Sequence, residues 1–119
     1  MADVQTHEGS CHCGAVAYEV EMSLDGLIEC NCSHCYRKGF VLGFVQPDAF
    51  RLSADGPQTE YLFNNHKIRH RFCDTCGVQT FARGTAPDGS EMVAVNVRTL
   101  QDVEPYSVAT QRFPGRAKL

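Results

Sequence analysis

The residues of this sequence that are best suited to chemistry are seven cysteines in three short clusters. Cysteine thiolates bind zinc tetrahedrally. Structural sites take all four ligands from the protein, whereas catalytic sites leave one position for water or substrate. Seven cysteines therefore divide naturally into a closed set of four and an open set of three. The clusters are Cys11 with Cys13, then Cys30, Cys32 and Cys35, then Cys73 with Cys76.

The simplest division joins the two outer pairs into one closed zinc site and leaves the middle cluster to hold a second zinc. Closing a loop of roughly sixty residues with a metal would stabilise the fold strongly. Gly77 suits the tight turn of a CxxC pair, because glycine adopts conformations that other residues avoid. The predicted structural ligands are Cys11, Cys13, Cys73 and Cys76, and the predicted ligands of the second zinc are Cys30, Cys32 and Cys35, giving two zinc ions per chain.

Two alternatives to this division remain open. A lone CxC or CxxC pair can be a redox pair or simply buried cysteines, although three clusters that use every cysteine favour metal binding. A fourth side chain could also close the second site, and His34, His66 or His70 is available. His34 lies between two ligands, so its binding to the same metal would be strained. Otherwise each histidine is a surface residue or supports a ligand.

The elements that must position these cysteines are short strands. In segment 15–20, Val16, Tyr18 and Val20 alternate with residues of the other face, as in a half-buried strand. Five prolines and ten glycines divide the chain into short pieces. One helical turn is expected over 33–38, and a loosely ordered tail from 111. The strand-like segments are 15–20, 27–29, 40–45, 50–53, 59–64, 67–72, 79–83 and 91–97. This pattern predicts an all-β sandwich or open barrel.

Length and charge narrow the class of protein. At 119 residues the chain fits one domain, 1–119, with one core. The formal charge is −3, and two zinc ions on seven thiolates would add +4 − 7 = −3, giving about −6, so no nucleic-acid partner is expected. No basic leader or long apolar run is present, so we expect no membrane association and a cytoplasmic protein. An odd number of cysteines in a reducing compartment argues against a disulfide framework.

The motifs CHCG, CNCSHCYRKG, HRFCDTCG and VNVRTL, in this order, resemble the glutathione-dependent formaldehyde-activating enzyme family, which includes the centromere protein V group. The resemblance covers about Glu8 to Tyr106, which would be the core of the domain. It implies a small zinc-bearing β-tent of two packed antiparallel sheets, with the outer cysteine pairs structural and the middle cluster catalytic. The implied activity is carbon–sulfur lyase chemistry, forming or cleaving S-(hydroxymethyl)glutathione or a similar thiol–aldehyde adduct.

An open zinc with three thiolates favours soft sulfur, so a substrate thiol such as glutathione would occupy its fourth position beside an aldehyde. His34 is the candidate proton donor to the developing oxygen. The carboxylates of the thiol would be received by charge-assisted hydrogen bonds. The candidate catalytic residues are Cys30, Cys32, Cys35 and His34, and the candidate substrate-binding residues are Arg69, Arg71 and Arg37.

The alternative function is a non-catalytic zinc module that binds a protein partner. Such a module could leave the second site empty or close it, whereas an enzyme needs that site loaded and open. A thiol redox protein using Cys73 and Cys76 is a third interpretation. It has less support, because both cysteines serve in the closed site.

Overall fold

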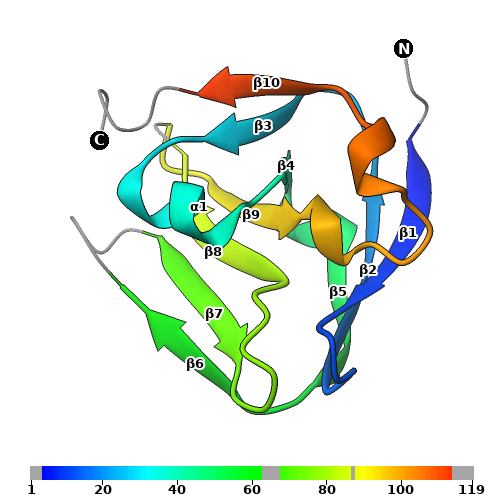
Figure 1. Cartoon of the computed structure of the whole chain (residues 1–119), viewed down its shortest axis with the longest axis vertical. Helices are drawn as coiled ribbons and strands as arrows, with labels where there is room; N and C mark the ends of the chain where they lie inside the picture. Colours follow the sequence, from blue (N-terminus) through cyan, green and yellow to red (C-terminus); the bar gives the residue numbers. More distant parts are fainter. Residues whose placement is uncertain (1–3, 63–67, 87, 114–119) are drawn as a thin grey trace.

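The computed structural model describes residues 4–62, 68–86 and 88–113. Short strands dominate, as the glycines and prolines of the sequence predict (Figure 1). The elements, in chain order, are β1 (Gln5–Ser10), β2 (Val16–Met22), β3 (Leu27–Cys30), α1 (Ser33–Lys38), β4 (Leu42–Val45), η1 (Pro47–Ala49), β5 (Phe50–Asp55), β6 (Gln58–Tyr61), β7 (Arg69–Cys73), β8 (Phe81–Thr85), β9 (Glu91–Asn96), η2 (Val97–Thr99), η3 (Pro105–Ser107) and β10 (Thr110–Phe113), where η marks a 3₁₀ turn.

The strands form two sheets. One has three strands in the order β1-β2-β5, and the other has seven in the order β10-β3-β4-β9-β8-β7-β6. Every described pairing is antiparallel except β10 with β3, which is parallel. Figure 1 shows β1, β2 and β5 together on the right and the two edges of the larger sheet, β10 and β6, far apart. The all-β class with two sheets is confirmed.

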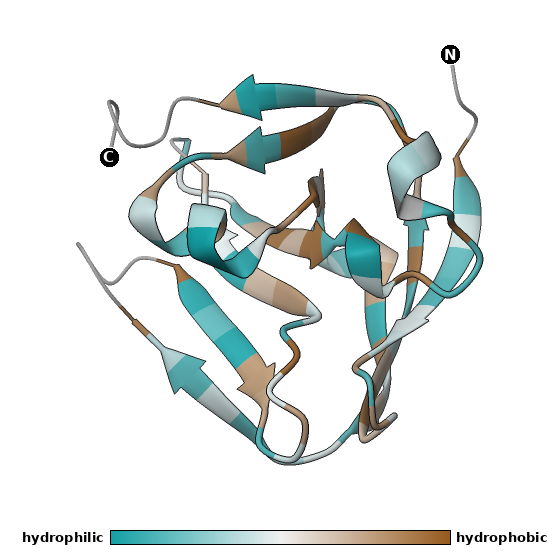
Figure 2. Cartoon of the chain, in the orientation of Figure 1, coloured by the Kyte–Doolittle hydropathy of each residue, from teal (hydrophilic) through white to brown (hydrophobic). Residues whose placement is uncertain are grey.

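Two edge strands differ from the expectation from sequence. The tail from 111 was expected to be loosely ordered, but residues 110–113 form β10 on the edge of the larger sheet. The expectation was wrong for residues 111–113, and residues 114–119 lie outside the described part of the chain. β10 is mainly polar (Figure 2) and half of its residues are exposed, so it carries no hydrophobic period. Backbone pairing with β3 holds it, together with a 2.8 Å hydrogen bond from the Thr110 hydroxyl to Glu29. The equally polar β1 gave no strand signal for the same reason.

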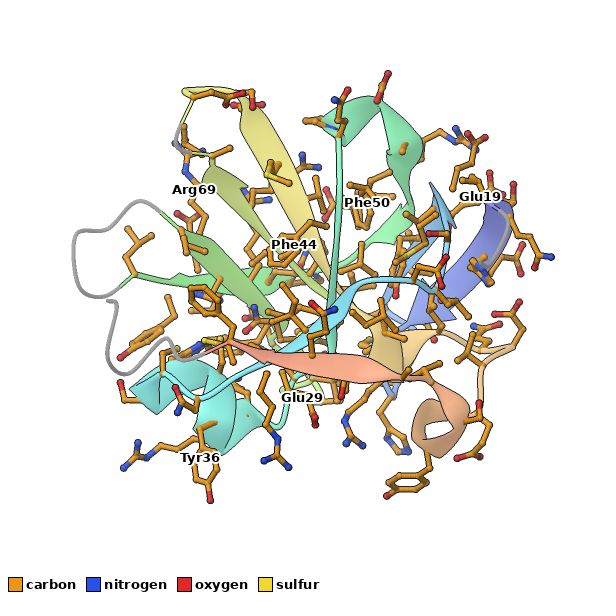
Figure 3. All side chains as sticks on the ribbon, turned by 90° about the horizontal axis from the view of Figure 1, so that it is seen from above. Glu19, Glu29, Tyr36, Phe44, Phe50 and Arg69 are labelled. Carbon is orange, nitrogen blue, oxygen red and sulfur yellow. The ribbon has the colours of Figure 1, made fainter. Side chains whose placement is uncertain are left out.

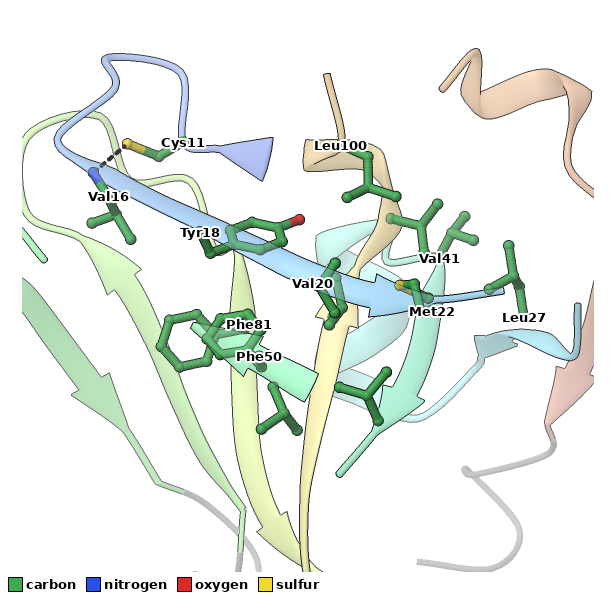
Figure 4. Close-up of a cluster of buried hydrophobic side chains, with 14 of the residues drawn as sticks. Cys11, Val16, Tyr18, Val20, Met22, Leu27, Val41, Phe50, Phe81 and Leu100 are labelled. Carbon is green, nitrogen blue, oxygen red and sulfur yellow. Dashed lines mark hydrogen bonds between the residues drawn. The ribbon is translucent and has the colours of Figure 1, made fainter. Parts of the chain in front are cut away.

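The core fills the space between the two sheets (Figure 4). Val16, Tyr18 and Val20 point into it from β2, as their alternation predicts. Tyr18 stacks on Phe50 with ring centroids 5.1 Å apart, and Phe50 packs on Phe81 of the larger sheet at 4.7 Å. These aromatic contacts join the sheets near the end where the outer cysteine pairs lie.

Gly9 of β1 allows the close approach of Tyr18. A Cβ at Gly9 would overlap the Tyr18 ring, which is fully buried and donates to or accepts from the Thr99 hydroxyl at 2.7 Å. We expect Gly9→Ala to lower the free energy of unfolding by about 1–3 kcal/mol, the usual cost of overpacking. Urea denaturation measures this. The exposed strand residue Ser53 offers a control, since Ser53→Ala should change stability by less than about 0.5 kcal/mol; equal effects would contradict the close packing.

The middle strands of the larger sheet carry apolar side chains on both faces. On β9, Val93 and Val95 face the core, whereas Met92, Ala94 and Asn96 alternate with them and line a cavity on the opposite face. Residues of β3 and of β7, near the two edges of the sheet, line the same cavity, so the sheet curves around it.

No helix among the described residues is long and apolar enough to cross a membrane.

Candidate metal centres and cavity

The outer cysteine pairs meet where the two sheets join. Cys11 and Cys13 lie in the turn between β1 and β2, whereas Cys73 ends β7 and Cys76 follows in the next turn. The four sulfur atoms all lie within 4.8 Å of one another. Cys13 Sγ is 3.7 Å from Cys11 Sγ and 3.6 Å from Cys73 Sγ. This group therefore ties the three-stranded sheet to the seven-stranded sheet.

The donor set of this group fits zinc. A Zn–S bond of about 2.3 Å in a tetrahedron places the sulfur atoms about 3.8 Å apart, close to the separations found here. Backbone N–H groups also point at the sulfurs: Val16 donates to Cys11 Sγ and Thr75 to Cys73 Sγ, both at 3.4 Å. Such hydrogen bonds favour the thiolate, which is the form that binds metal.

Tight turns make this convergence possible. Gly14 and Gly77 directly follow the second cysteine of their pairs and have φ of 84° and 77°. Glycine adopts this left-handed conformation without the steric cost that a Cβ brings. The backbone N–H groups of Cys13, in the other turn, and then of Val78 lower the pKa of the Cys76 thiol to about 6. These hydrogen bonds therefore favour the Cys76 thiolate.

The middle cluster surrounds the start of α1. Cys30 ends β3, Cys32 is the N-cap of the helix and Cys35 lies within it, with the three sulfurs all within 4.8 Å of one another. Cys32 Sγ accepts the Cys35 N–H at 3.3 Å, and Cys30 Sγ accepts the Cys32 N–H at 3.4 Å. Ser, Thr, Asp and Asn are the usual N-caps, so a cysteine here fits a ligand better than a capping residue.

In the middle cluster, burial and hydrogen bonding favour the ionisation of one thiol before the others. Burial raises the pKa of Cys32, but the backbone N–H groups of Cys35 and His34 and the neighbouring thiols bring it below its ordinary value. Burial, the hydrogen bond with Cys32 and its negative charge raise the pKa of Cys35 instead. Adjacent thiolates repel one another, so a bound cation is what would allow all three to be ionised together.

A cavity of about 380 Å³ opens beside the middle cluster. All three of its cysteines line the cavity, and so do the buried polar residues His70, Gln79 and Asn96. No described histidine or carboxylate joins the three sulfurs as a fourth metal donor: His34 and His70 lie outside the group, and His66 is outside the described residues. Within the described residues the second site is therefore a three-cysteine site that faces a cavity.

His70 has a defined tautomer in this cavity. The Gln79 side-chain nitrogen lies 3.0 Å from His70 Nδ1 and donates to the Phe81 carbonyl at 3.4 Å. With the amide nitrogen turned to donate to the Phe81 carbonyl, the same nitrogen donates to His70 Nδ1, which assigns the proton of the neutral ring to Nε2. Burial, with smaller contributions from His34 and Lys38, lowers the pKa of His70 to about 4.

Gln79 and Asn96 were not identified as a pair from sequence. Asn96 Nδ2 donates to the Gln79 carbonyl at 2.9 Å, and Asn96 Oδ1 accepts the Arg98 N–H at 3.2 Å. Asn96 thus holds the residue that orients His70. Asn96 belongs to the VNVRTL motif, which marks it, but a single glutamine before a strand has no motif and gives no signal.

The histidine predicted as a proton donor lies beside the cavity. His34 projects from α1, and its ring centroid is 4.1 Å from that of His70 and 5.5 Å from that of Tyr61, on which it stacks. It lines a separate depression of about 470 Å³ with Arg37 and Lys38. Burial first, and then the charge of Lys38, lowers the pKa of His34. His34 therefore reaches the cavity through its contact with His70.

The three predicted arginines do not line the cavity. Alternation along β7 places His70 on the cavity face, while Arg69 is exposed and Arg71 Nε lies 3.5 Å from a Glu60 carboxylate oxygen. Arg37 is exposed, lies in the depression with His34 and donates to the Ser33 carbonyl at 2.9 Å. Figure 3 shows Arg69 toward the upper left of the molecule and Phe44 nearer its middle. Their role in substrate binding stays a prediction.

Comparison with known proteins adds a family and a fold. The family model described as glutathione-dependent formaldehyde-activating enzyme matches residues 6–114, which include all seven cysteines. A Phaeosphaeria nodorum protein provisionally named for this enzyme is 33% identical over 79 residues, covering 61% of this chain and 42% of that protein. A Pyrenophora teres f. teres protein of the same provisional name is 28% identical over 83 residues, covering 63% and 44%. The match thus spans less than half of either relative.

A solved structure shares the architecture. The crystal structure of a Rhodobacter sphaeroides protein matches with a TM-score of 0.76 and 32% sequence identity. The match covers 87% of this chain and 99% of that one.

Proposed function

This chain belongs to the glutathione-dependent formaldehyde-activating enzyme family, and from that premise we propose that it is a zinc-dependent carbon–sulfur lyase acting on thiol–aldehyde adducts. The reaction would be the formation or cleavage of S-(hydroxymethyl)glutathione or a similar adduct. Its natural setting would be the cytoplasm, where seven free thiols and glutathione both remain reduced.

The observation that carries this proposal is the contrast between the two cysteine groups. The four-cysteine group offers a complete tetrahedral donor set, as structural zinc sites do. The three-cysteine group offers one donor fewer and faces a cavity of about 380 Å³. A site with an open position beside a cavity is the arrangement of catalytic zinc. Cys30, Cys32 and Cys35 would hold the catalytic ion, and the outer pairs the structural one.

Zinc at the middle cluster would lower the pKa of a substrate thiol and so supply a sulfur nucleophile at neutral pH. In the addition, the thiol sulfur forms a bond to the aldehyde carbon while the carbonyl π electrons move to oxygen. The proton that leaves the sulfur ends on that oxygen, so the product is a hemithioacetal and no electrons are gained or lost. Cleavage is the reverse.

Within the cavity, we assign the hydrogen bond to the developing oxygen to His70. Its pKa of about 4 keeps the ring neutral at pH 7, and the Gln79 amide keeps the proton on Nε2. A fixed donor aimed at a developing negative charge stabilises the transition state without reorganisation. His34, 4.1 Å away between ring centroids, would exchange protons between His70 and the depression on the surface.

The charged ends of a thiol such as glutathione would remain outside the cavity. Arg37 and Lys38 border the depression next to His34, so they would receive a carboxylate there. Arg69 and Arg71 face away from the cavity and would act only on a part of the substrate that extends over the surface.

The first test is the zinc content of protein purified without chelator, followed by exchange NMR of formaldehyde with glutathione. We expect about two zinc ions per chain and adduct exchange faster than the uncatalysed rate. One zinc per chain without catalysis would favour the non-catalytic zinc module that binds a protein partner. Two zinc ions without catalysis would retain the metal sites and reject the lyase.

A further inference from the structure

The cavity beside the three cysteines has a polar end and an apolar end. The cysteines, His70 and Asn96 form the polar end. Large apolar side chains from β4, β9 and the segment before β7 continue the wall, and none of the described lining residues is Asp, Glu, Lys or Arg. The main members of the apolar end are Phe44, Ile68 and Met92, and Ala94 lies between them and the cysteine cluster.

The apolar end is a consequence of strand alternation. Leu42 and Phe44 of β4 fall on the cavity face, as do Met92 and Ala94 of β9, because side chains two residues apart share a face. This face has no second sheet to cover it among the described residues, and Phe44 remains 46% exposed. Soluble proteins seldom leave such a surface open without a ligand or partner.

Two small alanine side chains leave the space at the apolar end of the cavity. Ala82 of β8 and Ala94 of β9 are directly opposite each other in the antiparallel ladder, and both line the cavity. Opposed side chains in such a pair have Cβ atoms roughly 5 Å apart, so a leucine at either position would project into this space. The cavity volume at the apolar end therefore depends on these two small residues.

Formaldehyde has no carbon chain and would leave the apolar end unfilled. The carboxylates and ammonium of glutathione do not suit that end either, because a buried charge without a partner is costly. Building on the proposed lyase function, we propose that the apolar end binds the hydrocarbon chain of an aldehyde larger than formaldehyde. Its carbonyl carbon lies at the cysteine end, and the chain extends along Ala94 toward Phe44.

The hydrocarbon chain of the aldehyde does not change the reaction. The thiol sulfur adds to the carbonyl carbon, the π electrons move to oxygen, and the proton released by sulfur goes to that oxygen. Neither an oxidant nor a reductant is needed. The hydrocarbon chain contributes only binding energy.

The test compares formaldehyde, propanal and pentanal with glutathione by exchange NMR, after subtraction of the uncatalysed rate. We expect kcat/KM, divided by the uncatalysed rate constant of the same aldehyde to correct for its electrophilicity, to rise about threefold to fourfold for each methylene added between propanal and pentanal, the gain from burying one methylene group. Ala94→Leu should cut the pentanal-to-formaldehyde ratio by at least about tenfold. Ala17→Leu is the matched control. Ala17 lies on β2 of the three-stranded sheet and faces away from the core, so this variant should keep the wild-type ratio.

A second measurement is independent of catalysis. Calorimetric titration with butan-1-ol, hexan-1-ol and octan-1-ol should show affinity increasing with chain length. If Ala94→Leu does not fold, as thermal unfolding would reveal, Phe44→Ser serves instead, because Phe44 is 46% exposed and its truncation should leave the core intact. This variant should lower octan-1-ol affinity by about tenfold or more.

The outcomes separate the two proposals. Formaldehyde turnover with no gain from longer aldehydes and no binding of the alcohols would overturn the inference and leave the lyase function standing. Absence of turnover with every aldehyde would reject the lyase function, and the aldehyde inference with it. Rising turnover and rising alcohol affinity, both lost in Ala94→Leu, would support both.

Discussion

Replacement of Cys73 by serine (Cys73→Ser) should unfold the chain. Cys73 is 1% exposed, and its sulfur lies 3.6 Å from that of Cys13 on the other sheet. Structural zinc sites contribute on the order of 10–16 kcal/mol in small domains, about as much as the whole stability of a typical domain. Loss of one thiolate should therefore abolish the cooperative thermal transition and the far-UV circular dichroism of the strands.

The control for Cys73→Ser is a conservative change within the same turn. Thr75 is exposed, and its backbone N–H, not its side chain, contacts Cys73 Sγ. Thr75→Ser should therefore melt within a few degrees of the wild type and retain its zinc. A folded Cys73→Ser protein with native stability would show that the four-cysteine group is not what holds the two sheets together.

Local patterns predicted the elements that surround the cysteines. The helical turn expected over 33–38 is α1, and the alternation at Val16, Tyr18 and Val20 correctly placed β2 and the side of it that packs on the core. Both patterns arise from short-range periodicity that one segment contains by itself. The grouping of the sulfur atoms into four and three also follows the spacing of the cysteines in the chain.

The features that sequence missed depend on pairing across the chain. β1 and β10 are polar edge strands, held mainly by backbone pairing that leaves no hydrophobic period. Gln79 acts on His70 only because β7 and the segment before β8 run side by side. Alternation within 67–72 puts Arg69 and Arg71 on one face of the strand and His70 on the other, but which of these faces meets the cavity depends on the curvature of the sheet.

Replacement of Cys35 by serine (Cys35→Ser) should have the opposite character: a folded protein without activity. Cys35 packs in a small cluster with Cys32, Phe40 and Leu42, apart from the main core between the sheets. Its loss leaves two thiolates, too few to hold zinc firmly. We expect one zinc per chain, a thermal transition within a few degrees of the wild type, and at least a hundredfold lower rate of adduct exchange.

Comparison with Tyr36→Phe distinguishes loss of a ligand from damage to α1. Tyr36 lies on the same helix, is exposed, and lines neither the cavity nor the depression beside His34. Tyr36→Phe should therefore keep two zinc ions and wild-type exchange. Unfolding of Cys35→Ser would instead make the middle cluster a structural site, and an active Cys35→Ser protein would exclude it as the catalytic centre. Because Cys73→Ser and Cys35→Ser remove the same atom from different groups, their contrast assigns one cysteine group to the fold and the other to the reaction.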